Sequence, residues 1–400
     1  MTGRVALDCD VRVTSATLRF ASVPFAIPLH LSSGAISELT EARVHIDVER
    51  RDGRTATGLG SVLLSYPWAG GTDTAMRSTV GRLTNLATTL GYGDPLELGT
   101  RLLDELPHLA LPHLALPHLA LPRRALPRLA AEVALGPVDQ AVHDAWARAA
   151  GRSAYGLYTA EFLAHDLGAY LGPDFAGRWP SDWLARSPQQ RLPIQYVLGV
   201  DEPASNAEGR DWIKVKLAGS VDADLARVRA VAAPGRTLSL DPNEAYTRVA
   251  DLRRFLASVD TAYVRYVEQP VPRGERGPGP ARIPVLADEG LPDPRHLDAL
   301  AGWDGIVVKT CRGQTAALLA YCWAKHRGRF VVQQDLTHVG PALAHAAAFA
   351  AHCSYSVRAF ECNSLKFAPA GNADLVAERP GLVTERDGSI EASVQGVGIR

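Results

Sequence analysis

Short apolar runs alternate with helix-like stretches across the second half of the chain, between residues 193 and 367. Runs of this length that are spaced by helices are typical of parallel βα units. Eight such units are enough to close a barrel. We therefore predict an α/β fold that contains a (β/α)-barrel of the modified TIM type. Its strands are expected at residues 194–198, 213–217, 237–241, 263–268, 285–288, 305–309, 330–334 and 357–361.

The first third of the chain has a different pattern. Residues 11–20 and 42–48 alternate apolar and polar side chains, as half-buried strands do, and residues 56–64 fit the return strand of a meander. Residues 74–90 and 138–150 have the spacing of helices. We expect these segments to form an α+β domain that precedes the barrel.

A low-complexity tract with a five-residue period lies between these two parts, at residues 106–130. Its prolines stand at 107, 112, 117, 122 and 127. Proline lacks the amide donor and clashes with the preceding helical turn, so we do not expect a continuous helix. We interpret the tract as a repeat expansion in a surface connection. A metal site on the repeated His108, His113 and His118 is the alternative.

Composition and charge exclude several classes of protein. Hydrophobic residues make up 46% of the chain and charged residues 21%, as in ordinary globular proteins. A net charge of -1 predicts no strong preference for nucleic acid or for an anionic membrane. No apolar run reaches the roughly 18 residues that cross a bilayer, and the N-terminus does not resemble a signal peptide. The five scattered cysteines suggest reduced thiols, so we expect a cytoplasmic protein.

Charged or amide side chains stand at the C-terminal ends of the predicted barrel strands. Active sites of (β/α)-barrels lie at this face, because strand ends and the following loops meet there. Charged groups inside a barrel are costly unless they are paired or bind a metal. We interpret the set as a functional site, the alternative being salt bridges that plug the barrel. The residues are Lys214, Lys216, Asp241, Asn243, Glu268, Asp288, Glu289, Lys309, Asp335, Glu361 and Asn363.

Three carboxylates of this set come from successive strands: Asp241, Glu268 and Asp288. Hard oxygen ligands that converge on one point suit Mg²⁺ or Mn²⁺. Three protein ligands leave positions open for water and for substrate oxygens. Asn243 and Glu289 lie beside the ligands in sequence and are expected to orient them. The sequence therefore predicts a divalent metal site at the mouth of the barrel.

Lysines are expected on either side of this metal. Lys214 and Lys216 are two residues apart on one strand, so their side chains face the same way. Two neighbouring ammonium groups lower the pKa of one of them, which would supply a neutral amine base. Lys309 ends a strand four positions further round the barrel, on the opposite side of a bound substrate. A base on each side of a metal suits removal of the proton alpha to a carboxylate.

The order KxK, DxN, VEQP, ADE and VVK resembles the enolase superfamily, and most closely its muconate-lactonizing-enzyme-like branch, the mandelate racemase/muconate lactonizing enzyme family. A Lys or His base that acts with Mg²⁺ is a known pattern of this superfamily. The resemblance implies metal ligands at Asp241, Glu268 and Asp288. It also implies that Lys216 is a base tuned by Lys214, and that Lys309 is the base or acid on the other side.

The resemblance also implies a domain plan and a homo-oligomeric assembly, which members of this family often form. We expect an α+β capping domain at residues 1–140, the catalytic barrel at 141–370, and a C-terminal segment at 371–400 that returns to the cap. Cap loops near residues 25–33 and 61–71 are expected to choose the substrate. Their side chains Phe25, His30, Tyr66 and Trp68 either cover the pocket or pack the cap on the barrel.

The sequence departs from the better-known members of the family at two strand ends. The Gly-Gly pair that the family often shows does not follow Lys309, and the last strand ends in FECN instead of the Asp-x-Asp pattern of dipeptide epimerases. Glu361 instead resembles the acidic residue that cycloisomerases carry at this strand end, with Asp335 and Asn363 as further substrate contacts. His338 does not match the histidine of the mandelate racemases and is expected in a loop.

These features leave three functions open. The leading interpretation is a racemase or epimerase that acts on an amino-acid-like or related small-molecule carboxylate. The second is a cycloisomerase, or a dehydratase or other lyase, in the same framework. The third is a non-catalytic binding barrel, against which the intact lysines and ligands argue.

Overall fold

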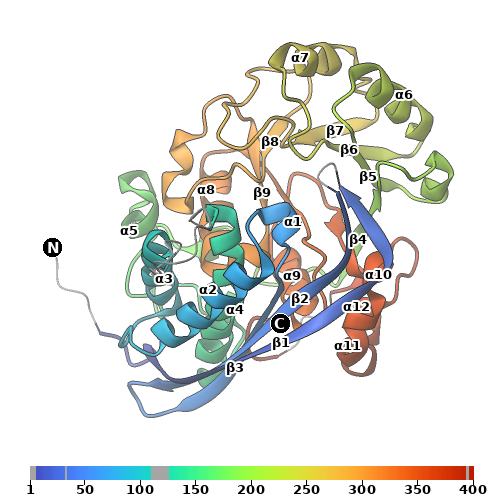
Figure 1. Ribbon diagram of the computed structural model, residues 1–400. Helices are drawn as coiled ribbons and strands as arrows, with labels where there is room; N and C mark the ends of the chain where they lie inside the picture. Colours follow the sequence, from blue (N-terminus) through green and yellow to red (C-terminus); the bar gives the residue numbers. More distant parts are fainter. Residues whose placement is uncertain (1–5, 32–33, 110–125, 393–395) are drawn as a thin grey trace, which may run out of the picture.

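A computed structural model describes residues 6–31, 34–109, 126–392 and 396–400 (Figure 1). The chain begins with an antiparallel sheet of three long strands, in the order β1 (Val11–Leu31), β2 (Gly34–Arg50) and β3 (Thr55–Leu63). Val44, Ile46 and Val48 on β2 are fully buried, and the residues between them are more exposed. This alternation is the one that predicted the strand, because successive side chains point to opposite faces.

Four helices follow the sheet: α1 (Tyr66–Ala69), α2 (Asp73–Ala87), α3 (Pro95–Leu109) and α4 (Arg128–Ala149). Helix α4 lies directly against β3, and two glycines of β3 make this approach possible. A Cβ atom on Gly60 would overlap the carbonyl oxygen of Pro137, and one on Gly58 would overlap that of Ala141. The sheet and α4 therefore pack more closely than side chains at these positions would permit.

Eight parallel strands in the described residues form a nearly closed barrel. Hydrogen-bonded neighbours run in the order β10, β9, β8, β7, β6, β5, β4, β11. Between β10 and the segment before β11, Ser356 closes the circle by donating its backbone N–H to Val331 and accepting from it through its hydroxyl. The bounds are β4 (Arg191–Leu198), β5 (Trp212–Lys216), β6 (Thr237–Asp241), β7 (Val264–Glu268), β8 (Val285–Ala287), β9 (Gly305–Val308), β10 (Phe330–Gln333) and β11 (Phe360–Glu361). Each predicted run overlaps one of these strands, so the predicted fold is confirmed.

Helices surround the barrel and complete the βα units (Figure 1). They are α6 (Val221–Val231), α7 (Val249–Ser258), α8 (Gln314–His326) and α9 (Pro341–His352), with a 3₁₀ helix, η5 (Pro294–Ala299), between β8 and β9. The short helices are α5 (Gly168–Leu171), α10 (Ser364–Phe367), α11 (Ala373–Glu378) and α12 (Pro380–Val383). Helices α6 and α7 stand at the top of the view, on the outside of the barrel. None of the helices in the described ranges is long and apolar enough to cross a membrane.

The end of the chain contacts both parts of the molecule. Strand β12 (Ser389–Glu391) pairs antiparallel with β4 of the barrel. Ile399 then donates its backbone N–H to Asp144 on α4, and Arg400 forms an ion pair with the same carboxylate. The predicted boundary at residues 140/141 falls inside α4, which continues without a break. The division into domains stays a prediction.

Two expectations about the cap differ from the structure. Residues 25–31 belong to β1 and not to a loop, although the pairing with β2 is interrupted between Pro24 and Leu29. Residues 61–71 finish β3 and then form α1. In the repeat tract, α3 extends to Leu109 with Pro107 in its last turn, and α4 begins after Pro127. The expectations for the rest of the tract, with His113 and His118, lie outside the described residues.

Helix α4 joins the sheet to the barrel through buried polar side chains. Gln140 accepts the backbone N–H of Ser61 on β3 and donates to the carbonyl of Thr310, which follows β9. One residue away, Asp139 accepts the backbone N–H and the hydroxyl of Thr315 on α8. Buried polar groups that are fully bonded in this way fix one arrangement of the elements that carry them.

Candidate active site

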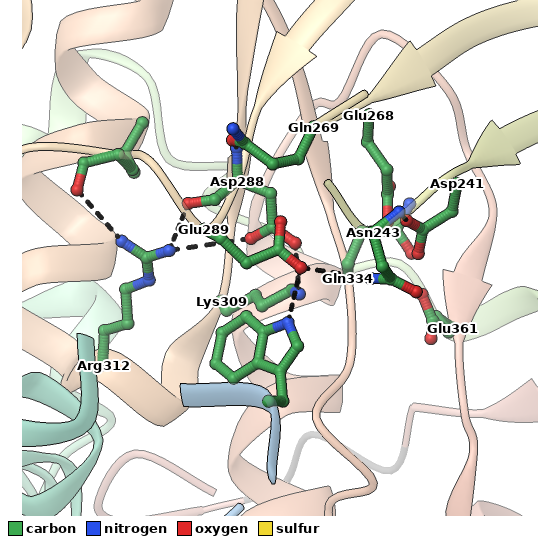
Figure 2. Close-up of polar contacts among 12 residues, drawn as sticks. Asp241, Asn243, Glu268, Gln269, Asp288, Glu289, Lys309, Arg312, Gln334 and Glu361 are labelled. Carbon is green, nitrogen blue, oxygen red and sulfur yellow. Dashed lines mark hydrogen bonds and ion pairs between the residues drawn. The ribbon is translucent and has the colours of Figure 1, made fainter. Parts of the chain in front are cut away.

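The predicted site residues meet at the C-terminal ends of the barrel strands. Lys214 and Lys216 come from β5, Asp241 from β6 and Glu268 from β7. Asp288 and Lys309 immediately follow β8 and β9, and Glu361 ends β11. All are buried. In Figure 2, Asp288, Glu289 and Lys309 lie beside one another, with Asp241, Asn243, Glu268 and Glu361 further to the right.

Each lysine pairs with a carboxylate that was predicted as a metal ligand. The Nζ atom of Lys216 lies 2.5 Å from Oδ2 of Asp241, and Nζ of Lys309 lies 2.5 Å from Oδ2 of Asp288. Lys214 is 2.5 Å from Oε1 of Glu268, 2.8 Å from Oε2 of Glu361 and 3.3 Å from Oδ2 of Asp241. These contacts bring the strand-end residues together in a single charged cluster.

Lys214 is not the lysine of this pair whose pKa is lowered. Two lysines on one strand were expected to lower the pKa of one of them. Burial does lower the pKa of Lys214, but the carboxylates of Glu268, Glu361 and Asp241 outweigh it and raise the pKa well above its usual value. Lys309 behaves in the same way: burial opposes the charge, Asp288 and Glu289 favour it, and the pKa is raised. Lys214 is therefore held as an ammonium group.

The cluster contains more carboxyl groups than lysines. Asp241, Glu268, Asp288, Glu289 and Glu361 supply five buried carboxyl groups against three lysines. Burial, followed by the charge of Asp241, raises the pKa of Glu268 well above its usual value. Burial and the charge of Asp288 raise the pKa of Glu289 to about 7. Unbalanced buried charge is unfavourable, so the surroundings suit a divalent cation.

The oxygen atoms of this cluster test whether a cation fits. Oε2 of Glu268 and Oδ1 of Asp288 are buried without a hydrogen-bond donor, although Oδ1 of Asp288 lies 3.6 Å from Arg312. Oε1 of Glu268 is ion-paired with Lys214. Within the described residues, no three acidic, histidine or cysteine side chains converge as a ready-made metal site. The carboxylates are turned to the lysines instead. The donor set nevertheless fits Mg²⁺, because its atoms are hard oxygens with free lone pairs.

Asn243 and Glu289 connect the two halves of the cluster. The amide of Asn243 accepts from Lys216 Nζ at 2.8 Å and donates to Glu289 Oε1 at 3.1 Å. Its backbone N–H donates to Asp241 Oδ1 at 2.9 Å, and its φ of 44° lies in the left-handed region. Asparagine tolerates this conformation better than most residues. Asn243 therefore holds Asp241 and Lys216 in place from one side and Glu289 from the other.

Two further residues support Asp288, and the sequence patterns did not single them out. Gln269 has a φ of 31°, and its Oε1 accepts the backbone N–H groups of Asp288 and Gly290. Arg312 donates to the carbonyl oxygen of Asp288 (Figure 2). It also lies 3.4 Å from Glu132. Gln269 stands within the VEQP motif and Arg312 three residues after Lys309. Their positions beside these motifs are the sequence signal that could have identified them.

The wall formed by β10 and β11 carries a second charged group. Asp335 accepts the backbone N–H groups of His338 and Asn363, each at 2.7 Å. His338 Nδ1 lies 2.8 Å from Asp335 Oδ1. Burial lowers the pKa of His338, but Asp335 outweighs it and raises the pKa to about 10. Asn363 also donates to Glu361. His338 lies in the loop after β10, as expected.

The four cap residues differ in their relation to the site. Trp68 is buried, and its Nε1–H donates to Glu289 Oε1 at 2.7 Å. Phe25 packs in an apolar cluster between cap and barrel. His30 lies 3.5 Å from Asp201 with its side chain 51% exposed, and Tyr66 is exposed. Of the four, only Trp68 lines the cavity over the lysines, which has a volume of about 40 Å³.

The distribution of lysine along the chain is a further signal that the motifs alone did not use. The chain contains five lysines and 37 arginines. Three of the five lysines lie in this cluster, while arginines carry most of the positive charge elsewhere. A fixed, permanently charged guanidinium cannot exchange a proton near neutral pH, whereas an amine can. Because lysine is scarce in this chain, three lysines at the barrel mouth indicate a site that uses amine groups.

Comparisons with known proteins agree with this geometry. Residues 201–399 match the family model described as "Enolase C-terminal domain-like". The chain belongs to the enolase superfamily. The resemblance to the mandelate racemase/muconate lactonizing enzyme branch, predicted from the series of motifs, is confirmed. A search of curated proteins found no match.

Solved structures of enolase-superfamily members share the fold at low sequence identity. The L-Ala-D/L-Glu epimerase from Bacillus subtilis is 19% identical with a TM-score of 0.67, covering 97% of each chain. A dipeptide epimerase from Enterococcus faecalis V583, complexed with Mg and L-Leu-L-Tyr, is 19% identical with a TM-score of 0.65, covering 89% of this chain and 92% of that one. A muconate lactonizing enzyme from Mycobacterium smegmatis, complexed with muconolactone, is 18% identical with a TM-score of 0.66, covering 97% of this chain and 96% of that one.

Proposed function

We propose that this protein is a metal-dependent racemase or epimerase that removes and returns the proton alpha to the carboxylate of an amino-acid-like substrate. One observation carries the proposal. Lys216 and Lys309 stand at the ends of β5 and β9, which are four strands apart in the eight-stranded barrel. Such strands lie on opposite walls, so the two amines face a substrate at the barrel axis from opposite sides.

The residues have distinct parts in this proposal. Lys216, as the free amine, accepts the alpha proton on one side, and the Lys309 ammonium donates a proton on the other. The reverse transfers serve the other stereoisomer. Lys214, which three carboxylates hold as an ammonium group, supplies positive charge beside the reacting centre and does not exchange the proton. Acid–base catalysis of this kind contributes roughly 10²–10⁴-fold to rate.

Asp241, Glu268 and Asp288 are the residues that would hold Mg²⁺ or Mn²⁺, with Asn243 and Glu289 orienting them. A bound divalent cation stabilises negative charge on substrate oxygens. Mg in the Enterococcus faecalis dipeptide epimerase complex supports this choice of cofactor. Asp335, Glu361 and Asn363 are proposed to contact the rest of the substrate. We also propose a cytoplasmic location and a homo-oligomeric state.

Proton exchange in ²H₂O tests the proposal. Single stereoisomers of dipeptides and of N-acyl amino acids are incubated with the protein and Mg²⁺, and deuterium at the alpha carbon is measured by NMR. We expect deuterium to enter with inversion of configuration. Lys216→Ala and Lys309→Ala should each reduce the reaction by roughly 10²–10⁴-fold, and excess EDTA should stop it. Lys325→Ala, a matched change outside the cluster, should leave it unaltered.

A cycloisomerase or a lyase is the second candidate, and Glu361 is the observation that favours it. Its carboxylate ends β11 and pairs with Lys214, so it faces the same cavity as the two bases. In that case one lysine moves a proton and the other acts by its charge. A cyclic product, or a product that lacks the elements of water, would replace the racemase proposal. Metal binding without any exchange would support the non-catalytic binding barrel.

A further inference from the structure

Trp68, a residue of the cap, makes two polar contacts with the barrel, one with Lys309 and one with Glu289. The Lys309 ammonium lies 4.3 Å from the centre of the Trp68 ring, on its face. The indole N–H of Trp68 donates to Glu289 Oε1 at 2.7 Å. A cation at this distance from an indole face is attracted by the ring, most strongly where water is excluded. Trp68, Lys309 and Glu289 are all buried.

The helix that carries Trp68 is held by a loop of the barrel. Arg273, which follows β7, donates to the carbonyl oxygens of Trp68 and Ala69 at 3.1 and 3.2 Å. These carbonyls belong to the last turn of α1, where a positive charge is favourable. Glu244, which follows β6, in turn pairs with Arg273 at 2.6 Å. Residues that follow four successive barrel strands, β6 to β9, therefore contact α1, either directly or through Arg273.

We propose that Trp68 is a positioning residue for Lys309: its ring fixes the ammonium group of the base, and its N–H fixes Glu289 beside Asp288. The inference rests on the proposed function, because the position of Lys309 affects the reaction only through its role as a base. Among the described residues, no aromatic ring contacts Lys216, the base on β5. The position of α1 on the barrel therefore fixes the side chain of Lys309 and not that of Lys216.

Geometry distinguishes this role from simple packing. A side chain that only filled space would be replaced by any apolar residue of similar size. Attraction to the ring face requires an aromatic ring, whereas the bond to Glu289 requires the N–H as well. Phenylalanine preserves the ring and removes the donor, and leucine removes both. Comparing these two variants separates the ring contact from packing.

Lysine NMR tests the inference, because five lysines give only five Cε–Hε signals in protein labelled with ¹³C-lysine. Lys309→Arg identifies the signal of Lys309. A CH₂ group next to an ammonium over an indole face is shifted upfield by the ring. We expect the Lys309 signal upfield of that of Lys325 in the unaltered full chain. The shift should be partly kept in Trp68→Phe and lost in Trp68→Leu.

Three results would overturn the inference. The first is a Lys309 signal without the upfield shift in the unaltered protein, which needs no Trp68 variant to fold. The second is an unchanged shift in Trp68→Leu, and the third is an equal loss in the Phe and Leu variants. Arg273→Gln is a further check, since releasing α1 should reduce the shift while Trp68 is intact. Circular dichroism shows whether each variant is folded.

The outcome is independent of the proposed reaction. The NMR experiment measures where the Lys309 side chain lies and requires no substrate. Failure of Lys309→Ala to affect deuterium exchange would instead remove the base role and leave the position of Lys309 untouched. The two proposals therefore fail on different measurements.

Discussion

At the residue scale, charge pairing inside the barrel decides which groups keep their protons. Lys214 and His338 both show it. Burial alone would discharge each of them, yet nearby carboxylates keep both charged. A buried charge that is paired contributes to stability only within the pH range where both partners are ionised.

The pair of His338 and Asp335 predicts a pH dependence of stability. Asp335 raises the pKa of His338 to about 10, above the usual value of 6.5. The contribution of His338 is therefore complete below about pH 6.5 and is lost as the pH rises toward 10. His338→Gln should lower the free energy of unfolding by about 3 kcal/mol at pH 6, and the difference should shrink as the pH approaches 10.

Urea denaturation at pH 6, 8 and 10 measures this difference. His30→Gln is the matched control, because His30 is half exposed and its contact with Asp201 is long. The control should change stability little at any of these pH values. A constant difference between His338→Gln and the unaltered protein would contradict the assigned charge.

At the element scale, the sequence predicted the strands well and the contacts between elements poorly. The ends of β5, β6, β7, β8 and β9 were placed from local patterns, because a strand end is determined by neighbours in sequence. Trp68 and Glu289 are 221 positions apart, and no local pattern reports that they meet. The raised pKa of Lys214 likewise depends on carboxylates from three other strands, which a KxK spacing does not contain.

The contact between β3 and α4 predicts an element-scale effect. A Cβ atom on Gly60 would meet backbone atoms of Pro137 and Ala141, which cannot rotate away. Gly60→Ala should therefore lower the free energy of unfolding by about 1–3 kcal/mol. Gly81→Ala on α2 is the matched control, since its nearest neighbour would be 3.9 Å away.

The control should raise stability by about 0.5–1 kcal/mol, because glycine is unfavourable within a helix. Urea denaturation of both variants checks the pair. Equal effects of the two substitutions would show that β3 and α4 are not closely packed.

At the scale of the whole molecule, the buried acidic cluster predicts that folding is linked to metal binding. Five carboxylates face three lysines at the barrel mouth, so a divalent cation that binds the folded state should stabilise it. At a Mg²⁺ concentration about 100 times its Kd, the free energy of unfolding should rise by about 2.7 kcal/mol. Urea denaturation in Mg²⁺ and in EDTA measures the rise.

Glu268→Gln should abolish this dependence on Mg²⁺, because it removes one charged ligand. Lys325→Ala should preserve it. A Mg²⁺ effect of the same size in Glu268→Gln would exclude Glu268 from the site.

Helix α4 has a mechanical consequence for the whole molecule. It is bonded to β3 through Gln140 and to the barrel through Gln140 and Asp139. The three-stranded sheet and the barrel are therefore both hydrogen-bonded to the same helix. A hinge motion between them would break these buried hydrogen bonds. We therefore expect entry to the cavity of about 40 Å³ to depend on local movements of residues that line it, such as Leu29, Ile36 and Trp68, and not on a movement of the sheet relative to the barrel.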